Sequence, residues 1–452
     1  MDSQAAAAES PSPVLRYQAP RAAPTRVRYQ VMAFLGVLAF LTYFDRVCIM
    51  RAQGDIQRDL DLSDIRFGWI MSSFWLAYAV FEIPIGWWGD RFGSRRTLTR
   101  IVLGWSLFTA LSGTATGFLS LLAARFLFGM GEAGAFPNMA RVQARWLPLR
   151  SRARAGGMLW LMARWGGAFS PVIFGTMLRS FGHVESVTGV HAWRFGFWFS
   201  GLLGLAWVAL FYPWFRDEPR DKPTVNEAEL DLIESGRGPP AESRATPPGL
   251  WAALFTTPSL WAMALLYLCG SFGWSFFVSW MPRFLKDVHH ISFQNSEWMT
   301  VMPLFLGGIS CLLGGWLSDA LVKQTGWRRL GRAVFPITGC LTAAAAMLGL
   351  RFVHSPTHAA VLMCVAAAAY DFGQGANWAT IVDLGGGYAG TATGFINTVG
   401  NMGNFLQPVI GAWVFNHYGW PALFTVYTGA YVLAAFMWVF IDPRKSFYVS
   451  AE

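Results

Sequence analysis

Long apolar segments, separated by short polar ones, follow one another along almost the whole chain. A helix that crosses the hydrocarbon core of a membrane needs about 20 mostly apolar residues, and twelve segments of this kind can be distinguished. Six are predicted in the first half, at 30–50, 67–88, 97–116, 118–140, 155–179 and 194–215. Six more are predicted at 259–282, 298–320, 333–353, 359–382, 390–415 and 420–441. The pattern predicts an all-α membrane protein with twelve transmembrane helices.

A long polar segment, residues 216–258, separates the two sets of six helices. Thr224 and, three residues later, Glu227 predict a capping box for a short surface helix that ends before Gly236. A connector of this length lets two six-helix bundles move relative to each other. The predicted divisions are a disordered tail (1–29), a first bundle (30–215), the linker (216–258), a second bundle (259–441) and a final tail (442–452).

Basic residues gather in three of the predicted loops, whereas the loop after the third helix has none. The clusters follow the second, fourth and eighth helices and consist of Arg91, Arg95, Arg96 and Arg100; of Arg141, Arg145, Arg150, Arg152 and Arg154; and of Lys323, Arg328, Arg329 and Arg332. Because cytoplasmic loops are enriched in Lys and Arg, we expect these loops, the linker and both termini on the cytoplasmic side. The N-terminal tail has no apolar segment, so a cleavable signal peptide is not expected.

The composition agrees with a membrane protein. Only 13% of the residues are charged and 54% are hydrophobic, whereas about a quarter are charged in a soluble domain. The net charge of +9 comes from arginines clustered between apolar segments, so nucleic-acid binding is not favoured. The five cysteines lack CxxC spacing and no histidine pair has metal-ligand surroundings, so no disulfide, metal or cofactor is expected. No GxxxxGK[ST], HExxH or GxSxG motif occurs in a usable context, which disfavours an ATP-driven pump and an enzyme.

A short motif is repeated half a chain apart, at the end of the second predicted helix of each bundle. Its copies are Gly86-Trp-Trp-Gly-Asp90 and Gly315-Trp-Leu-Ser-Asp319, which share the spacing G-W-x-x-D. Internal repeats are typical of transporter folds, and we interpret the motif as a cytoplasmic gate held by ion pairs and helix dipoles. The alternative is a basic loop that only sets topology. The predicted gate residues are Gly86, Asp90, Arg91, Gly93, Arg95, Arg96 and Asp319.

The first copy, in full G-x-x-x-D-R-x-G-x-R-R, resembles the signature loop of the major facilitator superfamily. Three further segments resemble its anion:cation symporter family, which includes hexuronate, galactonate, glucarate and related sugar-acid carriers. They are Tyr43-Phe-Asp-Arg46, Arg125-Phe-Leu-Phe-Gly-Met-Gly-Glu-Ala-Gly-Ala-Phe-Pro137, and Gly394-Phe-Ile-Asn397 with Gly400-Asn401. The resemblance implies two six-helix bundles of the major facilitator fold around a central cavity. It also implies a plasma-membrane protein, functional as a monomer among membrane lipids, that imports small organic anions by proton symport.

Ionisable groups at membrane depth cost roughly 2.5–3.5 kcal/mol each on insertion scales, so they usually face a cavity and have a function. The candidates are Asp45, Arg46, Glu82, Arg125, Glu132, Arg164 and Asp371. Arg46 offers a planar fork that fits a substrate carboxylate, and the resemblance assigns the same part to it; the alternative is an arginine snorkelling at the helix end. Asp45 is predicted to carry a proton, with a simple helix-end acid as the alternative.

Arg125 and Glu132 are seven positions apart and therefore lie on one face of a helix. They are about 10 Å apart along its axis, so we expect them to interact through the cavity or through Arg46. The resemblance places proton coupling on Glu132, with Arg125 beside it. The alternative is a structural pair that holds the fourth predicted helix against the first.

Arg164 stands where relatives often carry an uncharged residue such as glutamine. A second arginine suits a substrate with two acidic groups, or a firmer hold on one carboxylate. Glu82 likewise stands where glutamine is common, which adds a third titratable group. Asp371 is interpreted as structural, and an arginine is a candidate partner for it. Further substrate contacts are predicted at Tyr43, Tyr78, Gln374, Trp378, Asn397 and Asn401, of which Trp378 and Asn397 match positions that the family uses for substrate.

The leading hypothesis is proton-driven import of sugar acids or related carboxylates. A second transporter hypothesis is export or exchange of anionic metabolites or drug-like compounds. Outside transport, the chain could be a membrane sensor, which would usually carry a soluble output domain.

Overall fold

The computed structural model describes residues 23–235, 246–289 and 297–448, and the regular elements in these ranges are α-helices and short 3-10 turns. The long helices of the first half are α1 (Val27–Arg51), α3 (Asp64–Phe92), α4 (Ser94–Ser112), α5 (Phe118–Glu132), α6 (Ala135–Trp146), α7 (Arg152–Thr188) and α8 (Ala192–Trp214). Those of the second half are α11 (Pro258–Ser279), α13 (Glu297–Thr325), α14 (Arg328–Gly349), α15 (Pro356–Phe372), α16 (Gln374–Gly385) and α17 (Ala389–Met437). Shorter helices are α2 (Gln53–Asp59), α9 (Glu227–Glu234), α10 (Leu250–Thr256) and α12 (Met281–His289).

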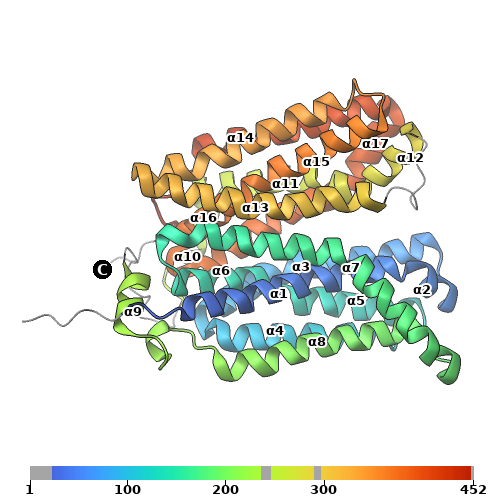
Figure 1. The fold of residues 1–452 in the computed structure, drawn as a ribbon, viewed down its shortest axis with the longest axis horizontal. Helices are drawn as coiled ribbons and strands as arrows, with labels where there is room; N and C mark the ends of the chain where they lie inside the picture. The colour runs from blue at the N-terminus through green and yellow to red at the C-terminus, as the bar shows by residue number, and fades with distance from the viewer. Residues whose placement is uncertain (1–22, 236–245, 290–296, 449–452) are drawn as a thin grey trace, which may run out of the picture.

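The helices form two bundles that lie one above the other in Figure 1, with α1 to α8 below and α11 to α17 above. Each bundle buries its own apolar core. The core of the second bundle draws its buried residues from Leu250 to Phe447. A large core of the first bundle is completed by Trp378, Val382 and Ala389 from the second, so the two bundles pack together around these side chains.

A helix overlies each of the twelve predicted segments, but the helices are not all separate spans. Eight described segments are long and apolar enough to cross a membrane, and one of them, Pro356–Phe440, has 85 residues. A helix of that length would be about four times longer than the hydrocarbon core is thick, so this segment must cross more than once. Backbone breaks at Gly386 (φ 51°) and Gly419 (φ 71°) divide it. The number of crossings and the side of the termini stay predictions.

The predicted helix 118–140 is interrupted, which the sequence analysis did not anticipate. It divides into α5 and α6 because Gly134 adopts a left-handed conformation (φ 81°) between them. A Cβ atom at Gly134 would lie 2.4 Å from the Cγ2 atom of Ile85, so only glycine fits. The predicted helix 359–382 also divides, into α15 and α16 at Gly373, although Gly373 keeps right-handed dihedral angles (φ −79°, ψ −16°). Both breaks fall beside charged candidates, namely Glu132 at the end of α5 and Asp371 near the end of α15.

The linker contains the predicted surface helix, α9, but its N-cap is Asn226 instead of Thr224. The cap differs because the Asn226 side chain accepts a hydrogen bond from the Glu229 backbone N–H, 3.0 Å away. The buried Glu229 carboxylate accepts hydrogen bonds from the backbone N–H groups of Val27 and Arg28, each 3.2 Å away. These contacts dock α9 on the first turn of α1, which begins three residues before the predicted helix. The rest of the expected N-terminal tail (1–22), part of the linker (236–245) and the last residues (449–452) lie outside the described ranges.

Candidate functional site

The two motif aspartates lie where the bundles meet, and each binds the first turn of a helix from the opposite bundle. Asp90 of α3 accepts hydrogen bonds from the backbone N–H groups of Gly390 (3.1 Å) and Thr391 (2.6 Å) at the start of α17. Asp319 of α13 accepts hydrogen bonds from the backbone N–H groups of Ala153 (3.3 Å) and Arg154 (2.8 Å) at the start of α7. Helix N-termini carry partial positive charge, so both carboxylates stabilise contact between the bundles.

The motif glycines permit this approach. A Cβ atom at Gly86 would lie 2.5 Å from the Gly390 carbonyl oxygen, and one at Gly315 would lie 2.3 Å from the Ala153 carbonyl oxygen. Gly93 has a φ of 91° and marks the turn between α3 and α4. The repeat therefore has the same geometry in both bundles, with glycine for the close approach and aspartate for the helix N-terminus.

Among the described residues, no hydrogen bond or ion pair joins the arginines of the motif loop to the other bundle. Arg91 and Arg96 are exposed, and Arg95 donates from Nε to the Tyr212 carbonyl oxygen at 2.8 Å within its own bundle. Other arginines form ion pairs at this end of the bundles, and sequence reasoning used them only for topology. They are Arg141, 3.6 Å from Asp90; Arg332, 2.7 Å from Asp319; and Arg152, which pairs with Asp383 across the bundles at 2.6 Å.

The end of the molecule at which Asp90 and Asp319 cross between the bundles is called the motif end. From there, hydrogen bonds between the bundles continue as far as Trp165. There the indole N–H donates to the Phe305 carbonyl oxygen at 3.4 Å. In the described ranges, α7 makes no hydrogen bond to the second bundle between Trp165 and its end at Thr188. The structure is therefore closed at the motif end.

Arg46 and Glu132 form a direct ion pair inside the first bundle. The Arg46 Nε–H points between the two carboxylate oxygens, each 3.0 Å away. Its guanidinium carbon lies 4.5 Å from the centroid of the Tyr78 ring and 5.1 Å from that of Tyr43. The Arg46 side chain is 10% exposed and Glu132 is fully buried, which does not fit an arginine snorkelling at a helix end. The Nη2 atom of Arg46 has no hydrogen-bond partner among the described residues.

Asp45 and Arg125 are buried close to this pair. One Asp45 carboxylate oxygen and all three Arg125 guanidinium nitrogens lack a hydrogen-bond partner in the described ranges. Asp45 and Glu132 lie within electrostatic range of Arg125, whose guanidinium stacks 4.4 Å from the centroid of Phe128. Arg125 and Glu132 do not bond directly, as their spacing predicts. Several hydrogen-bonding atoms of Asp45 and Arg125 are therefore left without a protein partner in the described ranges.

Arg164 and Asp371 pair across the two bundles. Arg164 of α7 donates from Nε to one Asp371 oxygen at 2.9 Å and from Nη2 to the other at 2.7 Å. This is the bidentate geometry of a strong guanidinium–carboxylate pair. The Arg164 side chain is 5% exposed and that of Asp371 is fully buried. The sequence analysis named an arginine as a candidate partner for Asp371 without identifying which one.

A second carboxylate, Glu82 of α3, is also held across the bundles. It accepts hydrogen bonds from the side-chain amides of Asn397 (2.8 Å) and Asn401 (3.2 Å), one turn apart on α17. Glu82 is fully buried. The structure thus brings two of the predicted substrate contacts together on a carboxylate that the sequence suggested only as an additional titratable group.

The remaining predicted contacts are Tyr43, Gln374 and Trp378, and their surroundings differ. The Tyr43 ring is near Arg46, and its centroid lies 6.5 Å from that of the Trp160 ring. Trp160 in turn lies 5.2 Å from the Arg164 guanidinium, so Tyr43 and Trp160 together connect the two arginines. The Gln374 side-chain oxygen is buried without a hydrogen-bond partner in the described ranges. Trp378 is fully buried, and its indole N–H donates to the Gln143 side-chain oxygen at 2.8 Å.

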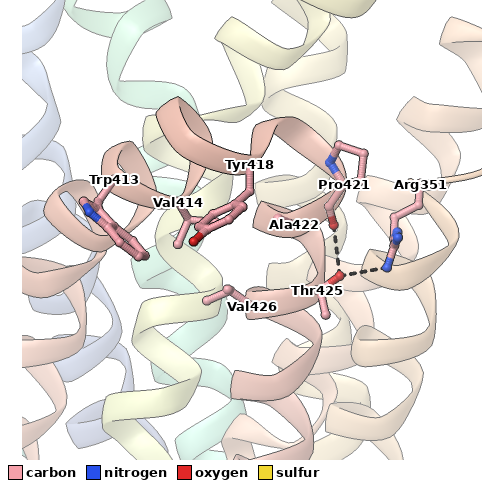
Figure 2. Close-up of a pocket in the computed structure, with 8 residues that line it drawn as sticks. All are labelled: Arg351, Trp413, Val414, Tyr418, Pro421, Ala422, Thr425 and Val426. Atoms are coloured by element: carbon pink, nitrogen blue, oxygen red, sulfur yellow. Dashed lines mark hydrogen bonds between the residues drawn. The ribbon is translucent and has the colours of Figure 1, made fainter.

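Two open cavities of about 640 Å³ lie away from these residues. Figure 2 shows the first, between the end of α14 and the bend of α17, where Arg351 donates a hydrogen bond to Thr425 across from Trp413 and Tyr418. The second lies on the outer face of α1 and α8 and is lined mainly by apolar side chains. Neither cavity is lined by a predicted site residue. Both are therefore separate from the charged centre, the group of buried ionisable residues described above: Arg46, Arg125, Arg164, Asp45, Glu82, Glu132 and Asp371.

Known proteins resemble the chain over nearly its whole length. The family model of the Major Facilitator Superfamily matches residues 35–408. The "Probable sulfoacetate transporter" of Cupriavidus necator is 30% identical over 423 residues, covering 92% of this chain and 94% of the relative. The D-galactonate transporter of Escherichia coli is 28% identical over 425 residues, covering 91% and 94% respectively. These relatives confirm the resemblance to sugar-acid carriers.

A solved structure of a proton:xylose symporter, bound to 6-bromo-6-deoxy-D-glucose, has the same fold. It superposes with a TM-score of 0.69 at 17% sequence identity, covering 92% of this chain and 96% of that one. The family model covers more than half of the chain, and the relatives are named transporters. The chain therefore belongs to the Major Facilitator Superfamily and is a multi-pass plasma-membrane transporter, not an enzyme.

Proposed function

We propose that this transporter imports small organic anions, sugar acids or related carboxylates, together with protons, by alternating access of two six-helix bundles. Relatives named for sulfoacetate and D-galactonate support this substrate class, because both molecules are organic acids. The observation that carries the proposal is the buried Arg46–Glu132 pair, in which a guanidinium suited to a substrate carboxylate is occupied by a carboxylate of the protein.

Competition for Arg46 couples the two transported species. Glu132 holds the guanidinium while it is charged. A proton on Glu132 removes that charge and roughly halves the strength of the hydrogen bonds that it accepts, which leaves Arg46 to the substrate. Asp45, with its unpartnered oxygen, is the second proposed proton carrier. Arg125 lies within electrostatic range of both acids and is the third proposed member of the proton-coupling group.

The balance of charge also favours proton uptake with the anion. The centre contains three arginines and four acids, which gives a net charge of 3 − 4 = −1 when all are ionised; they are Arg46, Arg125, Arg164, Asp45, Glu82, Glu132 and Asp371. A bound monoanion makes this −2. Uncompensated charge is costly in a buried site of low dielectric. Each proton taken up with the substrate removes one negative charge.

The proposed substrate contacts surround this centre. Tyr43 and Tyr78 flank Arg46 with flat aromatic faces and hydroxyl groups suited to a hydroxylated carbon chain. Gln374, Asn397, Asn401 and Arg164 add polar groups from both bundles. Trp378 is covered in the closed seam and would reach substrate only after the motif end opens. The motif end is the proposed cytoplasmic gate, and a monomer is the proposed functional unit.

The test is uptake of labelled D-galactonate, D-glucarate and sulfoacetate into proteoliposomes under an inward proton gradient. Wild-type protein should accumulate at least one of them. Glu132→Gln, which keeps the size but cannot titrate, should lose gradient-driven accumulation and retain counterflow, because counterflow needs no net proton movement. Glu227→Gln, at an exposed acid of the linker helix α9, is the matched control and should behave as wild type. Unchanged accumulation by Glu132→Gln would exclude it as the coupling residue, and exchange without accumulation in wild type would favour an exchanger.

A further inference from the structure

Arg164 is a proposed substrate contact, but its ion pair with Asp371 has not yet been given a role in the transport cycle. It joins the two bundles with both guanidinium–carboxylate hydrogen bonds shorter than 3 Å. Buried ion pairs are poor stabilisers, because removing two charges from water offsets most of their attraction. A pair that also has to separate when the bundles move is an inefficient way to hold them together. This placement favours a role in binding.

The surroundings of the pair are built for an anion held against a guanidinium. The Arg164 guanidinium lies 4.2 Å from the centroid of Trp274 on α11 and 5.2 Å from that of Trp160 on α7, so aromatic faces from both bundles enclose it. On the other side, a Cβ atom at Gly307 of α13 would lie 2.3 Å from an Asp371 oxygen. The backbone of α13 therefore closes directly on the carboxylate.

The two arginines border the same aromatic pair. Arg46 lies 5.1 Å from the Tyr43 ring centroid, the Tyr43 and Trp160 rings are 6.5 Å apart, and Arg164 lies 5.2 Å from Trp160. A small molecule lying on these two rings has one guanidinium near each end. Each guanidinium is occupied by a protein carboxylate, Glu132 at one end and Asp371 at the other.

We propose that the preferred substrate is a dianion, whose second anionic group takes the place of the Asp371 carboxylate on Arg164 while the first binds Arg46. This rests on the proposed function and specifies its substrate class. A hydroxyl group at that end of a monoanion cannot replace a charged bidentate partner, because charge-assisted hydrogen bonds are about twice as strong as neutral ones. A monoanion therefore leaves the Arg164–Asp371 pair intact, and Asp371 selects for a second charge.

The test compares two matched pairs of ligands by titration calorimetry on the purified protein. D-Glucarate and D-gluconate share their carbon chain and differ by one carboxylate, and sulfoacetate and methanesulfonate also differ by one carboxylate. The variants are Arg164→Gln, Asp371→Asn and the two combined. Because Arg164→Gln alone leaves a buried carboxylate unpaired and could fold poorly, the combined variant keeps a neutral hydrogen-bonding pair at the same place. Monodispersity in size-exclusion chromatography checks folding of each.

In wild type, each dianion should bind more tightly than its monoanionic match. Arg164→Gln and the combined variant should weaken dianion binding about tenfold or more, the effect of losing one charged hydrogen-bonded contact, and change monoanion binding less than about threefold. Asp371→Asn should strengthen dianion binding with little effect on monoanions, since it frees Arg164.

A pair that only clamps the bundles predicts instead equal effects of Asp371→Asn on both ligand classes, and that result would overturn the inference. Tight monoanion binding without preference for dianions would also overturn it and leave the proposed function intact, whereas failure of all four anions to bind wild type would overturn the proposed function itself.

Discussion

Removing the charge of Asp90 should release the motif end. Its carboxylate accepts hydrogen bonds at the start of α17 from the backbone N–H groups of Gly390 and Thr391, at 3.1 and 2.6 Å, and from the Thr391 hydroxyl at 2.7 Å. In Asp90→Asn one carboxylate oxygen becomes an amide nitrogen, which cannot accept a hydrogen bond. At least one of the three bonds is lost, together with the attraction between the charge and the helix N-terminus.

The magnitude follows from these contacts. A hydrogen bond to a charged group contributes about 1.5–3 kcal/mol, and a carboxylate at a partly buried helix N-terminus contributes up to about 2 kcal/mol. A conservative loss of about 2 kcal/mol changes the ratio of closed to open motif ends about 30-fold. Because the hydrogen bonds form only when the bundles touch, the whole loss acts on the closed state.

The assay is a distance measurement between spin labels on the two bundles at the motif end, in a background without the native cysteines. Arg100 on α4 and Gln324 on α13 are exposed positions for the labels. Asp90→Asn should shift the population to longer distances, and Asp319→Asn, at the equivalent position of the repeat, should do the same. Arg96→Gln, at an exposed residue of the same loop, is the control and should leave the distances unchanged. If Asp90→Asn gives the same distance distribution as this control, the contact with α17 does not hold the motif end closed.

Three further predictions concern other charged groups. Arg46→Lys should weaken binding of a carboxylate substrate at least tenfold, because a point charge replaces a planar fork; calorimetry showing wild-type affinity would exclude Arg46 from the site. Glu229→Ala should lower the thermal unfolding temperature by removing the cap on Val27 without abolishing counterflow, since the linker helix lies outside the centre; an unchanged unfolding temperature would contradict this role. If Asp45 and Glu132 each carry a proton, uptake of a monoanion should increase with an inside-negative potential, which adds about 2.3 kcal/mol per 100 mV for each net positive charge. Voltage-independent uptake in valinomycin-treated proteoliposomes would mean that only one proton moves.

The helices and the repeated G-W-x-x-D motif could be predicted because their signals are local. Apolar length placed a helix at every predicted segment, and the G-W-x-x-D spacing identified Asp90 and Asp319 before their partners were known. The break in the predicted helix 118–140 also had a local signal, since glycines are frequent around Gly134. It was missed because an apolar segment with several glycines is compatible with a straight transmembrane helix as well as with a broken one.

The pairings at the centre could not be predicted from one sequence. Arg164 and Asp371 are 207 positions apart, and Glu82 and Asn397 are 315 apart, so no periodicity connects them. The insertion cost of a charge indicates that it has a partner or a cavity, but it does not distinguish one arginine from another. The arginines of the motif loop were misjudged for a related reason. Their number indicated a cytoplasmic loop, whereas the contacts at the motif end depend on where each side chain points. Arg152 pairs with Asp383 across the bundles and Arg332 donates to the Leu149 carbonyl oxygen of the other bundle, whereas Arg141 pairs with Asp90 inside its own bundle.

The two levels of contact between the bundles suggest how substrate could control opening in the proposed cycle. At the motif end, Asp90 and Asp319 each bind a helix of the opposite bundle, and at the centre Glu82 and Asp371 do the same. Opening the motif end has to break both levels, and the central one is built from groups that the proposed substrate would bind. An anion on Arg164, or a hydroxyl group on Asn397, removes an interaction between the bundles before they separate. Binding thereby lowers the free energy needed to open the gate, because hydrogen bonds that opening would break have already been exchanged for hydrogen bonds to the substrate.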